Sequence, residues 1–177
     1  MKKRVRLQSR FESAFVNYLK LTAMLQDDLA AMLASESSAL HWRRNFVRTS
    51  VALLEGHAHC LRQMCVVALE CSAPRYISAK ERKVILDEGS FDASSRLKLT
   101  LRAAYKLFAL QPAPSFDSAD WGAAQRAVRK RNRLMHPKTF RDLGMADTTW
   151  RMHRRGIIWL MEQFFDFLSL SQAKYGN

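Results

Sequence analysis

The chain has 177 residues, of which 48% are hydrophobic and 25% charged, so its size and composition are those of one soluble folded domain over residues 1–177 and exclude a disordered or fibrous protein. Only 6 glycines and 4 prolines are present, which favours long regular elements over a turn-rich β design. Lys and Arg number 29 against 16 Asp and Glu, a formal charge of +13. This charge predicts salt-sensitive attraction to polyanions such as RNA.

The cysteines and the most apolar segment indicate where in the cell the protein is located. Cys60, Cys65 and Cys71 are an odd number without a C-x-x-C pair, which suggests neither a disulfide framework nor a zinc site and fits a reducing cytoplasm. The basic start "MKKRVRLQSR" is followed by no apolar signal region. The stretch "GIIWLMEQFFDFLSL" (156–170) is shorter than a membrane span and contains acidic residues. We therefore expect a cytoplasmic protein in which this stretch is a buried helix.

The first half of the chain predicts two long helices. From Lys3 to Ala34 apolar residues recur at spacings of three and four, which is typical of one amphipathic helix. The stretch "ASESSALH" breaks this pattern, and a second helix is expected from Trp42 to Glu70, ending before Pro74. The apolar positions of the first helix are Leu7, Phe11, Phe15, Tyr18, Leu21, Leu25, Leu29 and Leu33.

Three further helices are expected before residue 137. The segments 78–89 and 93–110 both have helical patterns, and each is expected to open with a serine cap. The stretch "QPAPSFDSAD" is the clearest loop in the chain. Asp117 or Ser118 is expected to cap the next helix, which must end by Pro137.

The last element is a long helix that follows the connector "KTFRDLGMADTT". Asp147 or Thr148 is expected to cap it, and it should reach about Ala173. No strand-like alternation of any length occurs along the chain. The sequence therefore predicts an all-α, up-and-down helical bundle of four long helices with a shorter inserted pair.

A polar stripe runs along the second helix. At about 100° per residue, Arg44, Arg48, Glu55, His59 and Arg62 fall in one narrow sector. This sector is either an exposed face with ordinary ion pairs or a charged wall that orients a partner residue or a phosphate. The expected core side of the same helix comprises Phe46, Val47, Val51, Leu54, Ala58, Leu61, Met64, Cys65 and Ala68.

The stretch "RKRNRLMHPK" (129–138) places a cation in an unexpected direction. Arg131 falls in the middle of the apolar face of its helix. Because an unpaired buried guanidinium is very costly, the helix is distorted, Arg131 extends past the core edge, or it meets a carboxylate, for which Glu55 is the preferred candidate. The expected polar face is Arg126, Arg129, Asn132, Arg133 and His136, and the expected apolar face is Ala124, Ala127, Val128, Leu134 and Met135.

These residue types can perform metal-free RNA cleavage. That reaction needs a group that exchanges a proton near neutral pH, which His136 offers, and fixed cations for the phosphorane, which Arg131 and Arg133 offer. Asn132 can hold the imidazole or a phosphate oxygen by a hydrogen bond. The alternative is a basic helix end in which the cations only oppose the helix dipole.

The other histidines suggest no metal or cofactor. His57 and His59 are two residues apart, so on a helix they point to different sides and cannot chelate one ion. His41 and His153 have no partner spacing and are expected at the surface or at a helix cap.

The motif "RNRLMH" resembles the signature of the HEPN superfamily, small all-helical domains of which many are metal-independent endoribonucleases. That signature is an Arg followed after four to six residues by a His, often with a polar residue after the Arg; here these are Arg131, Asn132 and His136. The run "RRNFVRTSVALLEGHAH" (43–59) is also similar to the second-helix segment of certain bacterial members. The resemblance covers residues 40–173.

The resemblance implies a homodimer in which two motifs face each other and form one composite site, with RNA cleaved to a cyclic phosphate without a metal. His136 would be the acid/base group, Arg131 the phosphate-binding cation and Asn132 the orienting residue. Arg48 would contact RNA phosphate from the second helix, with Glu55 in a supporting role. Toxin–antitoxin and phage-defence systems are the settings that the family implies.

Arg129 and Arg133 are expected to guide RNA from the solvated side of the same helix. One subgroup of the family is silenced by nucleotidylation of a Tyr two residues after the His; Lys138 occupies that position here, so control by that route is not expected. Two other classes remain open: a non-catalytic module that binds RNA or a partner, and a regulatory protein whose basic faces meet an acidic partner such as an antitoxin.

Overall fold

The computed structural model describes residues 2–71 and 77–175, except for the side chains of residues 2–5 and 25. This part is helical and contains no strand, so the predicted all-α bundle is confirmed. The helix expected from Trp42 to Glu70 spans Leu40–Cys71, and Pro74, which was expected to stop it, lies outside the described residues. In chain order the elements are α1 (Lys2–Ala34), α2 (Leu40–Cys71), α3 (Ala79–Ile85), α4 (Ala93–Leu107), α5 (Ala119–Met135), the 3-10 helix η1 (Phe140–Leu143) and α6 (Asp147–Tyr175).

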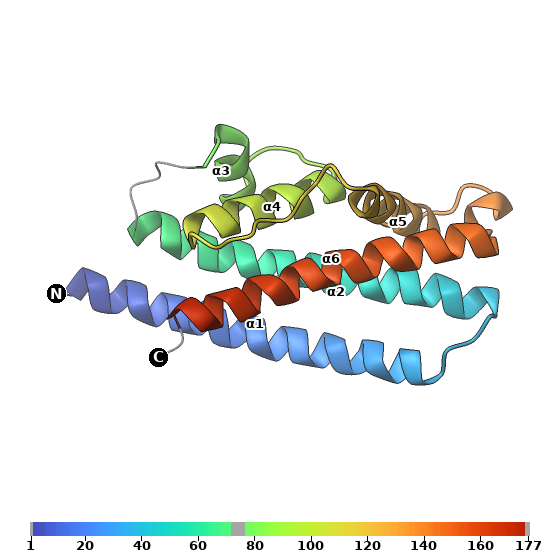
Figure 1. Ribbon diagram of the computed structural model, residues 1–177, viewed down its shortest axis with the longest axis horizontal. Helices are drawn as coiled ribbons and strands as arrows, with labels where there is room; N and C mark the ends of the chain where they lie inside the picture. The colour runs from blue at the N-terminus through green and yellow to red at the C-terminus, as the bar shows by residue number, and fades with distance from the viewer. Residues whose placement is uncertain (1, 72–76, 176–177) are drawn as a thin grey trace.

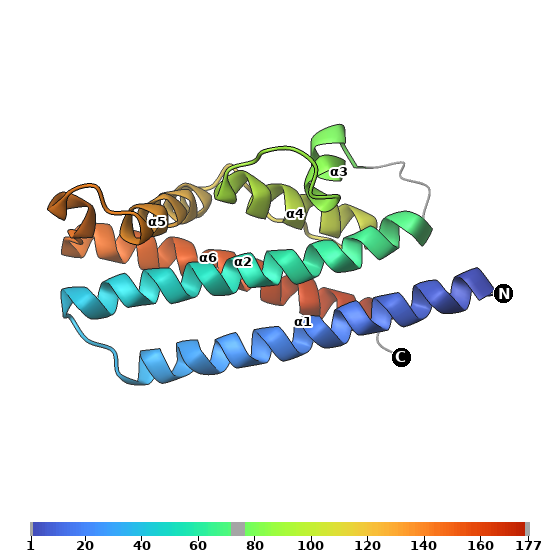
Figure 2. The same ribbon diagram turned by 180° about the vertical axis from the view of Figure 1, so that it is seen from behind.

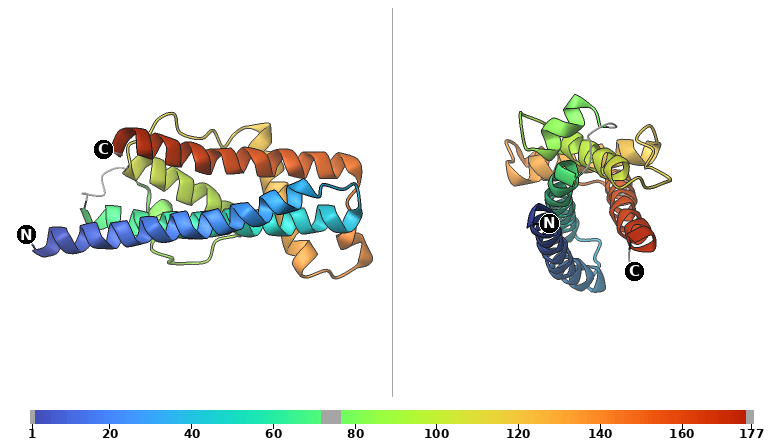
Figure 3. Two further views of the ribbon diagram at one scale, coloured as in Figure 1. Left: turned by 90° about the horizontal axis from the view of Figure 1, so that it is seen from below. Right: turned by 90° about the vertical axis from the view of Figure 1, so that its left-hand side faces the viewer.

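Helix α2 lies at the centre of the arrangement. Helices α1 and α2 run antiparallel along the length of the molecule, and α6 also runs lengthwise (Figure 1). Helices α3, α4 and α5 lie on the side of α2 away from α1, as the view from behind shows (Figure 2). Viewed along the bundle, α1 is at one edge (Figure 3), and in the described part it packs extensively only against α2.

A close approach joins α5 to α6. A Cβ atom at Gly156 would lie 2.2 Å from the backbone nitrogen of Ala124 and 2.3 Å from the carbonyl carbon of Ala123. No side chain fits in that space, so glycine is required there and the two helix backbones nearly touch. This contact fixes α5, which carries the Arg131 motif, against the longest helix of the second half of the chain.

The core side of α2 agrees with the prediction, whereas α1 differs from it. Every residue expected in the core face of α2 is buried except Ala68, which is half-buried. On α1, Tyr18 is fully buried, but Phe15, Leu21 and Leu33 are 36–39% exposed. The expected single apolar face is therefore only partly buried, because α1 rests against one helix and that contact covers a narrow arc.

The helix starts partly follow the predicted caps. Ser78 caps α3 in a capping box and Ser118 caps α5. Helix α4 is capped by Asp92 and not by a serine, since the Asp92 carboxylate accepts the backbone N–H of the third helical residue at 3.0 Å. Helix α6 already includes Asp147 as its first residue, so neither Asp147 nor Thr148 precedes it. The Asp147 carboxylate instead accepts a hydrogen bond from Arg43 at 2.5 Å.

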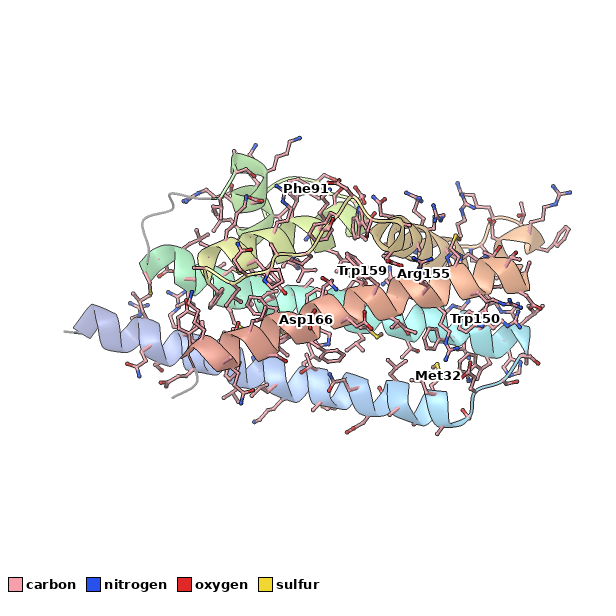
Figure 4. All side chains as sticks on the ribbon, in the orientation of Figure 1. Met32, Phe91, Trp150, Arg155, Trp159 and Asp166 are labelled. Carbon is pink, nitrogen blue, oxygen red and sulfur yellow. The ribbon has the colours of Figure 1, made fainter. Side chains whose placement is uncertain are left out.

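Aromatic side chains fix the start of α6 against α1 and α2. The Trp42 indole N–H donates to the Met32 carbonyl at 3.1 Å, and the ring packs edge-on against Trp150 with centroids 5.6 Å apart. Figure 4 shows Met32 of α1 and Trp150 of α6 at the same end of the bundle. The loop from the end of α5 to the start of α6 is therefore anchored at its far end. Within the described residues, no helix has both the length and the apolar character needed to cross a membrane.

Candidate active site

Arg131 is paired with the carboxylate that the sequence suggested. Its Nη2 donates to Oε2 of Glu55 on α2 at 2.5 Å, and the two side chains are 24% and 34% exposed. Helix α5 runs without interruption to Met135. Of the three alternatives for Arg131, the carboxylate partner is therefore correct, and the pair bridges α2 and α5.

The surroundings of this pair fix the orientation of the guanidinium. Burial raises the pKa of Glu55, and Arg131 and Arg96 partly offset that effect. Arg131 Nη1 donates to Oδ1 of Asn132 at 3.1 Å, and its Nε is buried and has no partner among the described residues. The guanidinium thus has protein contacts on two nitrogens and keeps further N–H groups for a ligand, since arginine carries five.

Arg44 and Arg48, which form the N-terminal part of the polar stripe on α2, bind backbone carbonyl groups. Arg48 Nη2 donates to the carbonyl of Leu134 at 2.8 Å, and its Nη1 donates to Asn45 Oδ1 at 3.3 Å. Arg44 Nη1 donates to the carbonyl of Leu143 at 3.4 Å. Arg44 and Arg48 are half-buried, so this part of the stripe is not the exposed face with ordinary ion pairs that was one of the two interpretations. Arg48 holds the C-terminal end of α5, where the final helical carbonyls lack helical partners.

His59 and Arg62, which form the C-terminal part of the same stripe, have different surroundings. His59 is exposed, whereas Arg62 is only 8% exposed. Burial lowers the pKa of Arg62, and Arg96 lowers it further, while Asp87 raises it. Arg62 thus faces the α4 side of the bundle and lies apart from the motif.

His136 stands at the end of α5, as the following proline requires. Its backbone N–H donates to the Asn132 carbonyl at 3.1 Å, which makes it the C-cap residue, and its side chain is exposed. Among the hydrogen bonds of the described residues, none joins its ring to Arg131. The motif therefore presents an oriented guanidinium and, one turn later on the same helix, an imidazole accessible to solvent.

The rest of the motif helix mostly follows the predicted faces. Arg129, Asn132 and Arg133 are exposed, as expected of the polar face. Leu134 is buried to 1% exposure, but Met135 is 50% exposed although it was expected on the apolar face. The helix ends at Met135 and no other element in the described part of the chain covers this residue, so its place on the helical wheel does not lead to burial.

Hydrogen bonds hold the loop after His136 in a defined conformation. The Asp142 carboxylate accepts the backbone N–H groups of Lys138 at 3.0 Å and Thr139 at 2.9 Å, and these bonds lower its pKa. Lys130 Nζ donates to the carbonyls of Asp142 at 2.7 Å and Gly144 at 2.6 Å.

Cations crowd around this loop. Burial lowers the pKa of Lys130, and the nearby charges of Arg133 and Arg44 lower it further, with Asp142 opposing them. A loop with this concentration of positive charge attracts phosphate.

Phe140 was missed by the sequence reasoning. Its ring is 82% exposed in η1, four residues after His136, and the Arg141 guanidinium carbon lies 6.0 Å from the ring centroid. The only signal in the sequence is an aromatic–Arg dipeptide inside a polar connector. An exposed aromatic face beside a cation is a platform on which nucleic acid bases stack.

Two other histidines are structural. His57 is 1% exposed, its Nδ1 lies 3.1 Å from the Tyr18 hydroxyl, and burial lowers its pKa to about 4. The expectation of a surface or capping position for His153 is wrong: it is 3% exposed, and burial, then Lys130 and Arg126, lowers its pKa to about 4. The described residues contain no group of three or more His, Cys, Asp or Glu side chains placed to bind a metal ion.

Comparison with known proteins finds no family model, no curated protein and no solved structure that matches the chain. The fold and the site define an all-α bundle with a bridged Arg–Glu pair and an exposed helix-end histidine. The HEPN resemblance therefore depends on the sequence alone, on the motif from Arg131 to His136 and the run 43–59.

Proposed function

We propose that this protein is a metal-independent endoribonuclease of the HEPN type that acts on single-stranded RNA in the cytoplasm, in a toxin or phage-defence setting. The observation that carries the proposal is the fixed Arg131 guanidinium, bound to Glu55 at 2.5 Å, on the same helix whose end carries the exposed His136. Arg and His with these roles are the minimal set for cleavage through a cyclic phosphate.

The proposed reaction uses each side chain in one role. The His136 imidazole takes the proton of a ribose 2′-hydroxyl, and the 2′-oxygen attacks the adjacent phosphorus. The bond from phosphorus to the 5′-oxygen breaks, that oxygen takes up a proton, and a 2′,3′-cyclic phosphate remains. Arg131 stabilises the added charge on the phosphorane, and Asn132, which accepts from Arg131 at 3.1 Å, orients the guanidinium.

A second copy supplies the second acid/base group in this proposal. Two motifs across a symmetric interface place one His136 as base and the other as acid, which is how a single histidine per chain serves both proton transfers. Arg129 and Arg133 are exposed beside the motif and suit contacts with flanking phosphates. Phe140 is available for base stacking.

The test is a product analysis on the purified protein with single-stranded RNA and excess chelator. We expect fragments with 2′,3′-cyclic phosphate ends, which mass spectrometry detects before and after acid treatment. Fragments with 3′-hydroxyl ends, or cleavage that requires added Mg²⁺, would contradict the proposal.

A non-catalytic helical module is the second candidate, and the contacts of Arg48 favour it most. Arg48 is already bound to the Leu134 carbonyl at 2.8 Å, so its position does not require RNA. Salt-sensitive RNA binding without any product on long incubation would establish this reading. An acidic protein that co-purifies with the chain would identify a regulator or antitoxin.

A further inference from the structure

Helix α1 has a second apolar seam that the fold does not cover. Taking the buried Tyr18 as the direction of α2, residues about 100° further round the helix recur with alternating spacings of three and four. The seam runs for about 26 Å along the axis at 1.5 Å per residue. Its members are the apolar residues Val16, Leu19, Ala23, Ala30 and Leu33 and the polar residue Gln26.

The seam is open to solvent. Val16, Leu19 and Leu33 are 46%, 45% and 39% exposed, Ala23 and Ala30 are exposed, and only Gln26 is half-buried. Six of the twelve exposed large apolar side chains of the described residues belong to α1, so the exposure is concentrated on this one helix. The spacing is that of the a and d positions of a coiled coil, whose apolar residues pack against a second helix.

The charges of α1 indicate which helix that is. Among residues 2–20 there are six Lys or Arg and one Glu, whereas residues 21–36 contain three acidic residues and no Lys or Arg. Two parallel copies of α1 would bring their basic halves together. Two antiparallel copies place each basic half along the acidic half of the other, so the helix is complementary to itself.

We infer that α1 pairs antiparallel with α1 of a second copy of this chain through the seam from Val16 to Leu33. In this register Leu19 of one copy meets Ala30 of the other, so a large residue faces a small one. Lys20 and Asp27, both exposed, then flank the seam on the same side and come within about 3 Å of each other along the axis at 1.5 Å per residue. The two-fold symmetry produces this ion pair twice.

This interface is independent of the proposed ribonuclease. The seam lies on α1, the Arg131 motif lies on α5, and these two helices do not pack together in the described part. Pairing through α1 leaves the motif surface free. Loss of association through α1 and loss of RNA cleavage can therefore be measured separately.

The experiment is sedimentation equilibrium of the full chain over a wide concentration series, with a charge exchange in α1. Lys20→Glu and Asp27→Lys each replace the two Lys20–Asp27 attractions across the interface with two repulsions. We expect each variant to weaken the association of two chains through α1 by about tenfold. The double variant Lys20→Glu/Asp27→Lys restores the attractions in the antiparallel register and is expected to associate like the natural chain. Lys80→Glu, an exposed site on α3, is the matched control and should change nothing.

Three outcomes would overturn the inference: a chain that stays monomeric throughout, single variants that associate like the natural chain, or a double variant as weak as the singles. Circular dichroism of each variant excludes unfolding as the cause, since both positions are exposed. RNA cleavage should be unchanged in Lys20→Glu, and a loss of cleavage restricted to His136→Ala would bear on the proposed function alone.

Discussion

The two sides of helix α2 differ in what they contact. On the side that faces α5, Glu55 binds the Arg131 guanidinium and Arg48 binds a backbone carbonyl, and both α2 side chains are partly exposed. On the side that faces α1, His57 is 1% exposed against a fully buried Tyr18. One helix therefore supports a polar, accessible cluster on one side and a closed packing contact on the other.

This difference predicts that the two sides respond differently to substitution. Partly exposed ion pairs contribute little to stability because water screens them, whereas a buried polar group that loses its partner costs considerably more. Changes on the α5 side should therefore alter cleavage with little effect on stability. Changes on the α1 side should alter stability and leave the cleavage chemistry intact.

Arg131→Lys should give the largest effect. Lysine keeps a cation beside Glu55, so the fold is expected to survive, but it lacks the planar fork that also reaches Asn132. We expect cleavage to fall by about a hundredfold or more, as for loss of one transition-state donor, measured as the initial rate on a fluorescent RNA. Arg82→Lys, at an exposed position on α3 outside the proposed site, is the control, and an Arg131→Lys protein as active as the control would contradict the assignment.

The stability of the α1 side should depend on pH through His57. Burial lowers its pKa in the folded state to about 4, below that of an unfolded histidine near 6.5. The unfolded chain therefore binds the proton first, so stability is full above about pH 6.5 and falls as the pH drops to about 4, by about 3 kcal/mol. Urea unfolding at a series of pH values measures this. His57→Phe should make the curve less steep, with the remaining slope due to His153, whose pKa burial also lowers to about 4; an equally steep curve for that variant would show that His57 is not responsible.

Tyr18→Phe should destabilise the fold by about 1–2 kcal/mol, because it removes the hydroxyl 3.1 Å from His57 Nδ1 and leaves a buried nitrogen without a partner. Urea unfolding at neutral pH tests this, with cleavage assayed in parallel. We expect the cleavage rate to stay within about twofold of that of the natural chain, since Tyr18 lies on α1. A large loss of cleavage with unchanged stability would reverse the comparison between the two sides.

Arg48→Met should have the smallest effect on stability. It removes a hydrogen bond to the Leu134 carbonyl at 2.8 Å while keeping the aliphatic stem, so we expect a loss of about 1 kcal/mol in unfolding free energy. Cleavage should fall by about tenfold, because the end of α5 that carries His136 is held less firmly. The exposed Arg82→Met on α3 provides the control. Unchanged RNA cleavage would assign Arg48 a purely structural role.

The sequence predicted those contacts whose energetic cost is visible in the residues themselves. A guanidinium on an apolar helix face demands an anion, and this requirement made Glu55 the preferred partner of Arg131 among three alternatives that the sequence left open. The position of His136 at a helix end followed from the proline after it. Each of these inferences uses one local rule and one strong penalty.

The features that the sequence did not predict are of two kinds. Some are contacts with backbone carbonyls, which every residue has, and others depend on whether another element packs over a residue. Arg48 binds a backbone carbonyl, and carbonyls leave no trace in the sequence. Met135 and Phe140 are exposed because none of the described elements covers them, and His153 is buried because its own helix, α6, packs against α5. The partial exposure of α1 has the same origin, since periodicity shows that a face is apolar and not how much of it a partner covers.

The central claim is tested most directly by cleavage of single-stranded RNA in excess chelator by the natural chain and by His136→Ala, with His59→Ala as a matched control, since His59 is also exposed. We expect the natural chain and His59→Ala to cleave alike and His136→Ala to lose about a hundredfold or more of the rate, as for loss of a general acid/base group. Equal cleavage by His136→Ala would contradict the assignment of the active site.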